Sequence, residues 1–187
     1  PMISRVLKQA GADYKDIEKI AVTVGPGAFT GLRIGLSTAR ALGLALGVPV
    51  AGLSTLDVVR RTFEKDGGPL AAGEVLCVLL ETRRADFYAQ LAEGRPESLS
   101  AEAVEERMAG RRAVFIGDAA ARFQKTLPGY AGWRFADGYD LPDPRLMAQM
   151  AAEGGAAVLP PEPLYLRGAD VSQPKNGRKI ILEDSGL

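Results

Sequence analysis

Residues 20–43 read IAVTVGPGAFTGLRIGLSTARALG. The β-branched run at 20–24 is typical of a buried strand, and the glycine-rich loop behind it leads into a helical pattern at 30–46. A second apolar run at 48–53 and a second helical pattern at 54–63 repeat this order. Strand, helix, strand and helix in succession predict a βαβ unit with parallel strands, and therefore an α/β fold.

The glycine-rich loop connects the predicted strand to the predicted helix and consists of Gly25, Pro26, Gly27, Ala28, Phe29, Thr30 and Gly31. Many folds bind a phosphate at such a place, on exposed backbone N–H groups. However, the spacing G-x-G-x-x-x-G is one residue longer than the dinucleotide fingerprint, and the loop lacks the lysine of a P-loop. The preferred interpretation is a tight turn in which the glycines permit positive φ angles.

Small residues recur at every fourth position of the following helix, at Gly31, Gly35, Ala39, Gly43 and Gly47. A glycine inside a helix costs about 1 kcal/mol relative to alanine, so some contact must offset the presence of Gly35 and Gly43. Positions spaced by four residues form the ridge along which helices pack. The neighbour that approaches this ridge could belong to the same lobe or to a partner subunit, and the pattern leaves both alternatives open.

The rest of the chain alternates predicted helices and strands. A helix is expected at residues 1–10, a hairpin at 75–80 and 86–91, a strand at 113–116, and further helices at 100–109, 118–127 and 143–153. A shift to charge, glycine and proline at 64–73 predicts a boundary between lobes. We therefore expect an N-terminal lobe at 1–65, a second α/β lobe at 66–167 and a mobile tail at 168–187.

The composition limits the chemistry of the chain, which has 187 residues, 23 basic and 23 acidic side chains, no histidine and one cysteine. Without histidine, the chain cannot form an imidazole base, a Ser-His-Asp triad or a histidine metal site. The lone Cys77 excludes an internal disulfide and suits a reducing cytoplasm. A net charge of zero is unusual for an independent nucleic-acid binder, so a role on RNA would be shared with a partner.

The sequence also gives no sign of a membrane segment or a signal peptide. The longest mostly apolar run, at 41–53, contains a proline and is shorter than the ~20 residues that a bilayer core requires. No signal peptide is expected, because the chain opens directly into a helical pattern. We therefore expect a cytoplasmic protein.

Three motifs resemble those of one known family. The stretch VGPGAFTGLRIG at 24–35, continued by LSTARALG at 36–43, closely resembles the hallmark of the TsaB family, also called YeaZ. The stretch ETRRADFY at 81–88 is similar to that family's D-A-R-x-x-E-V-Y hairpin, and PLYLR at 163–167 is similar to its near-terminal P-x-Y-L-R. The resemblance covers residues 1 to about 167.

This resemblance implies the fold of the actin/Hsp70/sugar-kinase superfamily, related to RNase H, with two small α/β lobes. It also implies a role in forming N6-threonylcarbamoyladenosine beside the anticodon of tRNAs that read codons beginning with A. In that family the chain is a non-catalytic subunit without a cofactor of its own. It pairs with the catalytic paralogue TsaD, the ATPase TsaE joins the pair, and tRNA is contacted only through the complex.

Members of the family begin with about three strands before their first helix, and we expect those strands to be missing from this chain. The alternative function is a self-contained enzyme, either an M22-type peptidase or a kinase or ATPase of the same fold. Such an enzyme requires a metal or nucleotide site. The chain offers neither histidine nor a P-loop lysine for that purpose.

The resemblance also implies a partner contact built as a helical bundle from the first two helices of each subunit. We hypothesise that five residues face the partner, namely Ile3, Leu7, Arg33, Leu36 and Arg40. The alternative is a purely structural role, in which the apolar residues of this set belong to the hydrophobic core. Arg33 in the first helical turn opposes the helix dipole, so a carboxylate in the partner or in the same lobe should compensate its charge. When the paralogue is absent, a homodimer through the same helices is expected.

Overall fold

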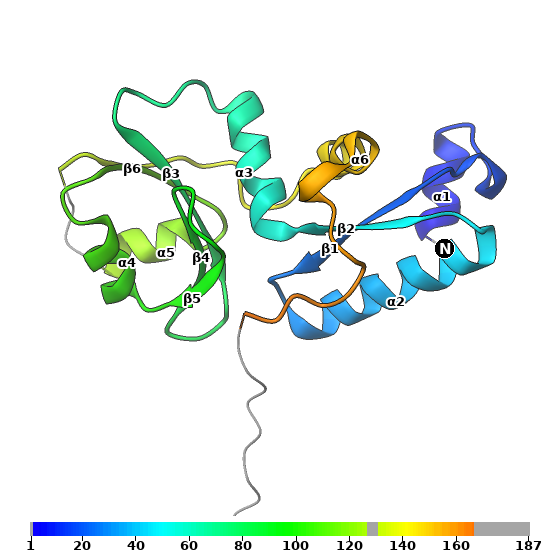
Figure 1. Ribbon diagram of the computed structural model, residues 1–187, viewed down its shortest axis with the longest axis horizontal. Coiled ribbons are helices and arrows are strands. Elements are labelled where there is room, and N and C mark those ends of the chain that lie inside the picture. Colours follow the sequence, from blue (N-terminus) through cyan, green and yellow to red (C-terminus); the bar gives the residue numbers. More distant parts are fainter. Residues whose placement is uncertain (1, 127–130, 167–187) are drawn as a thin grey trace, which may run out of the picture.

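The computed structural model describes residues 2–126 and 131–166, which form two β-sheets and the helices around them (Figure 1). The predicted tail at 168–187 lies outside these residues. The chain begins with α1 (Met2–Gln9) and a short 3₁₀ turn (Tyr14–Asp16). No helix within the described ranges is long and apolar enough to cross a lipid bilayer.

The first sheet has two parallel strands, β1 (Ile20–Gly25) and β2 (Val50–Ser54). The helix α2 (Phe29–Leu46) connects them and packs along one face, which is the βαβ unit that the sequence predicts. The helix α6 (Pro144–Glu153) contacts both strands and lies on the opposite side of the sheet from α2 (Figure 1).

The second sheet has five strands in the order β5-β4-β3-β6-β7. The central strand β3 pairs antiparallel with β4 and parallel with β6, so the predicted hairpin and the later strand share one sheet. The five strands are β3 (Glu74–Glu81), β4 (Phe87–Leu91), β5 (Glu97–Leu99), β6 (Arg112–Ile116) and β7 (Trp133–Phe135).

Alternation along β3 sends its side chains into two different cores. Leu76, Val78 and Leu80 pack against α3 (Thr55–Asp66). Cys77 and Leu79 lie on the other face, in a core shared with α4 (Ala101–Met108) and α5 (Ala120–Thr126). The second sheet is therefore the middle layer of three.

Helix α3 contributes to both halves of the molecule. Val59 and Phe63 pack on the second sheet. Val58 instead packs with Leu53 of β2 and Met150 of α6. The lobe boundary at 65/66 remains a prediction, and the structure adds that the helix before it is shared between the two cores.

The C-terminal part of the described chain returns to the first sheet. After a short 3₁₀ turn (Gly155–Ala157), Leu159 and Gly52 exchange two backbone hydrogen bonds of 2.8 and 2.9 Å. The backbone N–H of Leu164 then donates to the carbonyl of Val24 at 2.8 Å. A Cβ at Gly52 would lie 2.5 Å from Val24 Cγ1 and 2.6 Å from the carbonyl oxygen of Pro160, so only glycine fits at this crossing.

Replacing Gly52 by alanine should lower the free energy of unfolding by about 2 kcal/mol, because the new methyl group overlaps backbone atoms that cannot move without breaking the pair with Leu159. Urea unfolding followed by circular dichroism measures this change. Gly27→Ala is the matched control, since no atom lies within 4 Å of its added Cβ, and we expect a change below about 0.5 kcal/mol. Equal unfolding midpoints for the two variants would contradict the tight crossing.

Candidate partner interface on the first two helices

The glycine-rich segment between β1 and α2 turns sharply at Gly25. Gly25 has a φ of +111°, and a Cβ there would lie 3.1 Å from both the Leu164 carbonyl oxygen and Leu32 Cδ2. Gly25 and Pro26 are buried, whereas the rest of the motif, Gly27, Phe29, Thr30 and Gly31, is exposed. The turn therefore has the backbone conformation that the tight-turn interpretation requires.

The glycines spaced four residues apart along α2 lie in two different environments. A Cβ at Gly43 would lie 2.4 Å from Val50 Cγ2 and 3.1 Å from the carbonyl oxygen of Val48, so this glycine allows β2 to approach α2. Added Cβ atoms at Gly31 and Gly35 would have no other heavy atom within 4 Å. The close packing at Gly43 is therefore internal to the lobe, whereas nothing within the described chain accounts for glycine at position 35.

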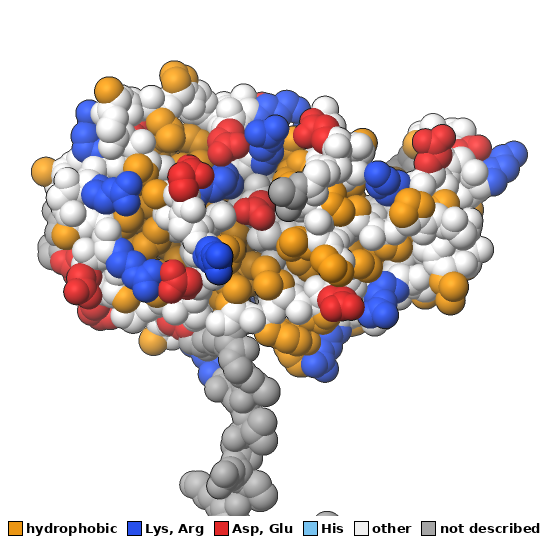
Figure 2. All heavy atoms as spheres, viewed as in Figure 1, with side chains coloured by type: hydrophobic (Ala, Val, Ile, Leu, Met, Phe, Trp, Pro, Cys, Tyr) orange, Lys and Arg blue, Asp and Glu red, His pale blue; other side chains and the backbone are white. Residues whose placement is uncertain are grey.

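Large apolar side chains are exposed on the same two helices. On α2, Ile34 is 62% exposed and Leu44 is 87% exposed. On α1, which has no buried residue, Val6 is 57% exposed, and Met2 is also exposed. Figure 2 shows hydrophobic side chains at both ends of α2, along the lower edge of the view. We call Ile34, Leu44, Val6 and Met2 the outer face of α1 and α2. An exposed apolar surface of this kind commonly marks a protein contact.

The five residues hypothesised to face a partner do not all lie at the surface. Ile3, Arg33 and Arg40 are exposed, and Leu7 is half-buried. Leu36 is only 3% exposed and belongs to the buried core. The structure therefore corrects the expectation for Leu36, whose side chain fixes α2 on its lobe and offers no surface to a partner.

The positive charge of Arg33 is compensated within the chain by an aromatic ring and a hydroxyl group, and not by a carboxylate. Its guanidinium carbon lies 3.8 Å from the centre of the Phe29 ring, and its Nε and Nη2 donate to the Tyr165 hydroxyl at 3.2 and 3.1 Å. The Phe29 and Tyr165 rings are 5.8 Å apart. Tyr165 belongs to the near-terminal motif at 163–167, but its distance from α2 along the sequence gives no sign that the two lie side by side. The last residue of this motif, Arg167, lies outside the described residues.

Helix α1 is held by few contacts. The hydroxyl groups of Ser4 and Tyr14 are hydrogen-bonded at 3.0 Å. A hollow of about 390 Å³ separates the helix from the following turn and is lined by Leu7, Lys8 and Tyr14 among others. The apolar side chains of α1 are therefore available to another surface.

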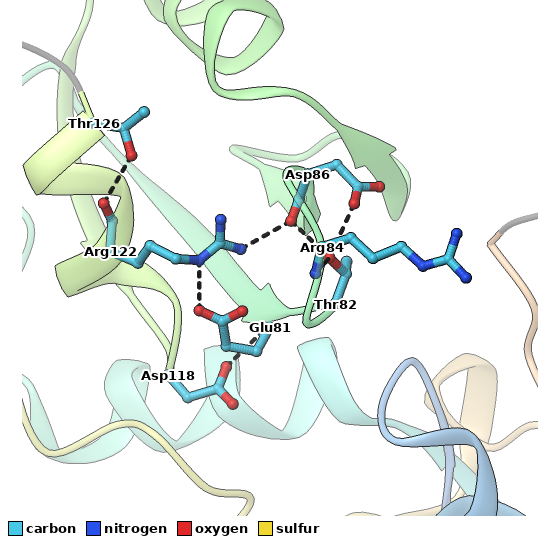
Figure 3. A network of polar contacts seen from close by, with 7 residues as sticks. All are labelled: Glu81, Thr82, Arg84, Asp86, Asp118, Arg122 and Thr126. Atoms are coloured by element: carbon cyan, nitrogen blue, oxygen red, sulfur yellow. Dashed lines mark hydrogen bonds and ion pairs between the residues drawn. The ribbon is translucent and has the colours of Figure 1, made fainter.

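The second family motif, at 81–88, forms a hydrogen-bonded network with α5 (Figure 3). Arg122 donates from Nε to Glu81 Oε1 at 2.6 Å and from Nη2 to the Asp86 carbonyl oxygen at 2.9 Å. Its guanidinium carbon also lies 3.9 Å from the centre of the Phe87 ring. Asp118 accepts a hydrogen bond from the Glu81 N–H at 2.8 Å, and partial burial raises the pKa of Asp118. The Glu81 carboxylate and the Asp86 backbone carbonyl thus fasten the hairpin to α5 through Arg122.

The described residues contain no group of three or more His, Cys, Asp or Glu side chains placed to hold a metal ion. Cys77 is fully buried, and burial raises the pKa of its thiol to about 11. A thiol with such a pKa is protonated at neutral pH and is a poor nucleophile. Cys77 is therefore a packing residue of β3.

Solved structures share this fold. A crystal structure from Pseudomonas aeruginosa, described as an uncharacterized protein with similarity to peptidase YeaZ, superposes with a TM-score of 0.67 and 25% identity over 89% of this chain and 82% of that chain. A structure described as YeaZ from the same organism gives a TM-score of 0.63 with 22% identity over 88% of this chain and 82% of that one. These similarities confirm the α/β fold of the actin/Hsp70/sugar-kinase superfamily.

A family model described as TsaD, tRNA N6-adenosine threonylcarbamoyltransferase, matches residues 1–172, so the chain belongs to this family. Within it, the similarity to proteins named TsaB and YeaZ confirms the predicted TsaB (YeaZ) assignment. The tRNA threonylcarbamoyladenosine biosynthesis protein TsaB of Buchnera aphidicola is 44% identical over 61 residues, which are 33% of this chain and 29% of that protein.

Another curated relative matches this chain over a longer stretch than the Buchnera protein does. An uncharacterized protein of Mycobacterium tuberculosis is 35% identical over 94 residues, which are 50% of this chain. The matched region spans 41% of that relative's length and 29% of the Buchnera protein's length. The chain thus spans less than half of the curated relatives that it matches.

Gly35→Ala should raise the free energy of unfolding of the isolated chain by about 1 kcal/mol, because the methyl group gains helix propensity and meets no neighbour. Gly43→Ala is the matched substitution on the same ridge. It should destabilise the chain by about 1–3 kcal/mol, because its Cβ overlaps Val50. Chemical denaturation of both variants measures the difference, and a loss of stability in Gly35→Ala would show that this position is packed after all.

Arg122→Gln should lower the free energy of unfolding by about 2 kcal/mol, since it removes a partly buried ion pair, a hydrogen bond and a ring contact together. Arg61→Gln is the control, because its pair with Glu64 is exposed and should contribute less than about 0.5 kcal/mol. Thermal and urea unfolding of the two variants test this prediction. It fails if the two substitutions have equal effects.

Proposed function

We propose that this chain is the non-catalytic subunit of the bacterial assembly that forms N6-threonylcarbamoyladenosine beside the anticodon of tRNAs reading codons that begin with A. In this role it pairs with the catalytic paralogue TsaD in the cytoplasm, TsaE joins the pair, and tRNA is reached through the complex. Family membership and the relatives named TsaB support the pathway. The exposed apolar outer face of α1 and α2 carries the subunit role.

Covering this outer face would be strongly favourable. Each fully buried Val, Leu, Ile or Met side chain contributes about 1.5–3 kcal/mol relative to its exposed state. Two of the four residues of the outer face lie on α1 and two on α2, so a partner that covers all four must contact both helices. The open space beside Gly35 would let a partner backbone approach α2 closely, which would account for a glycine at this position.

The charges on these helices indicate the kind of partner. Neither α1 nor α2 contains an aspartate or glutamate. Their exposed cations are Arg5, Lys8, Arg33 and Arg40. A second copy of this chain would bring like charges together, whereas a partner with carboxylates around an apolar centre would be complementary. We therefore propose the paralogue as the main occupant, and the homodimer as a weaker contact that needs salt to screen its charges.

The non-catalytic role is supported by the chemistry that the chain offers. Its sequence has no histidine, and the acidic residues Glu81 and Asp86 of the hairpin are engaged in contacts that hold the fold. No observation on the described residues favours the alternative of a self-contained M22-type peptidase or a kinase.

The double variant Val6→Glu/Leu44→Glu should weaken binding to the TsaD paralogue by at least about 100-fold, because two carboxylates would be buried against the partner. Isothermal titration calorimetry measures the affinity. In cells depleted of TsaB, the same variant should fail to restore the modified nucleoside, quantified by mass spectrometry. Its unfolding free energy should stay close to that of the unmodified chain, since both positions are exposed.

Leu141→Glu is the matched control, because Leu141 is 77% exposed and lies outside both helices. We expect it to bind and to complement normally. Undiminished binding by the double variant would show that the outer face is not the contact. If the unmodified chain itself binds no TsaD and restores no modified nucleoside, the proposed function is wrong.

A further inference from the structure

The guanidinium group of Arg33 is held in one orientation by two aromatic side chains. The ring of Phe29 lies against its flat face, and the Tyr165 hydroxyl accepts hydrogen bonds from its Nε and Nη2 atoms. The backbone before Tyr165 is anchored on the first sheet through the hydrogen bond between Leu164 and Val24, and Figure 1 shows this segment beside the first turn of α2. An arginine that is already held in place loses less conformational entropy when it binds.

One edge of this guanidinium group stays open. The Tyr165 hydroxyl occupies the side that carries Nε and Nη2. Nη1 and the second hydrogen of Nη2 form the other edge, and within residues 2–126 and 131–166 no hydrogen bond or ion pair engages Nη1. Paired N–H groups of this kind match the two oxygens of a carboxylate. Arg33 therefore offers donors of the right geometry for a carboxylate, and no anion in the described part of the chain uses them.

The open edge belongs to the same side of α2 as part of the outer face. In a helix that turns about 100° per residue, four exposed residues of α2 point within about 60° of one another, namely Phe29, Arg33, Arg40 and Leu44. Phe29 and Tyr165 are 53% and 49% exposed, so the aromatic support of Arg33 is itself at the surface. Aromatic residues and arginine are the types most often found where a protein contact contributes most to affinity.

We propose that Arg33 binds an aspartate or glutamate side chain of the TsaD paralogue through this open edge, and that Tyr165 is the positioning residue that holds the guanidinium group for it. This inference rests on the partner contact proposed above. A carboxylate is the fitting group, because α2 contains no acidic residue and the place of Arg33 in the first turn opposes the helix dipole. The first two helices of a second copy could not supply it, since neither contains an acidic residue.

The test titrates the whole chain with the purified TsaD paralogue by isothermal titration calorimetry at two salt concentrations. Arg33→Gln should weaken binding by at least about tenfold and make the affinity less dependent on salt, since a pair of opposite charges is lost. Arg33→Lys should keep the salt dependence and still bind at least about threefold more weakly than the unmodified chain, because an ammonium group does not present a planar pair of donors.

Tyr165→Phe separates the positioning role from a direct contact, because it keeps the ring and removes only the hydroxyl group. It should weaken binding by about threefold. In the Arg33→Gln background the same change should leave the affinity unaltered, since no guanidinium group remains to be held. Arg61→Gln is the control, because it removes an exposed arginine on α3 and should alter neither the affinity nor its salt dependence. All variants should unfold at the same urea concentration as the unmodified chain, since the substituted side chains are exposed.

Unchanged TsaD affinity in Arg33→Gln would overturn this inference and leave the proposed function in place. The same holds if Arg61→Gln weakens binding as much as Arg33→Gln does, because the effect would then follow the net charge alone. Equal losses from Tyr165→Phe with and without Arg33 would overturn the positioning role. If the unmodified chain binds no TsaD, the proposed function fails and this inference fails with it.

Discussion

The fold depends on α3, which is buried on two sides. Val58 and Val59 are neighbours in sequence, and because successive helical residues point about 100° apart, they enter different cores. Val58 belongs to the core between the first sheet and α6, whereas Val59 and Phe63 belong to the core on the second sheet. Loss of this helix would expose the face of the second sheet that it covers and would remove Val58 from the core that the first sheet shares with α6, so neither lobe has a complete core without it.

Helix α2 is in the opposite situation, because only one of its sides is covered. Leu36, Ala39 and Gly43 pack inward, and the remainder of the helix is exposed or half-buried. The helix is stable because its inner side is anchored on β1 and β2, and the glycine at position 43 brings the backbones close. This one-sided anchoring leaves the outer face of α1 and α2 free for a partner at no cost to the internal packing.

The sequence predicts the elements well and their environments less well. The predicted strand at 20–24 and helix at 30–46 correspond to β1 and α2, and the predicted hairpin corresponds to β3 and β4. β5 and β7 have no sequence signal, since each has three residues and exists by pairing with a neighbouring strand. Local periodicity also could not separate the outer residues of α2 from Leu36, because Leu36 is one helical turn from Arg33 and Arg40, and only the position of the sheet decides which of them is buried.

The net charge of the chain does not show where its charged residues lie in the structure. The balance of 23 basic and 23 acidic residues suggests a surface without a preferred partner. However, the first two helices carry four cations and no carboxylate, so the balancing acidic residues must lie elsewhere in the chain. Electrostatic complementarity acts over about one Debye length, roughly 8 Å at physiological salt, which is shorter than the 27 Å or so of an 18-residue helix. The exposed charged side chains of α2 itself, Arg33 and Arg40, are therefore both basic, although the whole molecule is neutral.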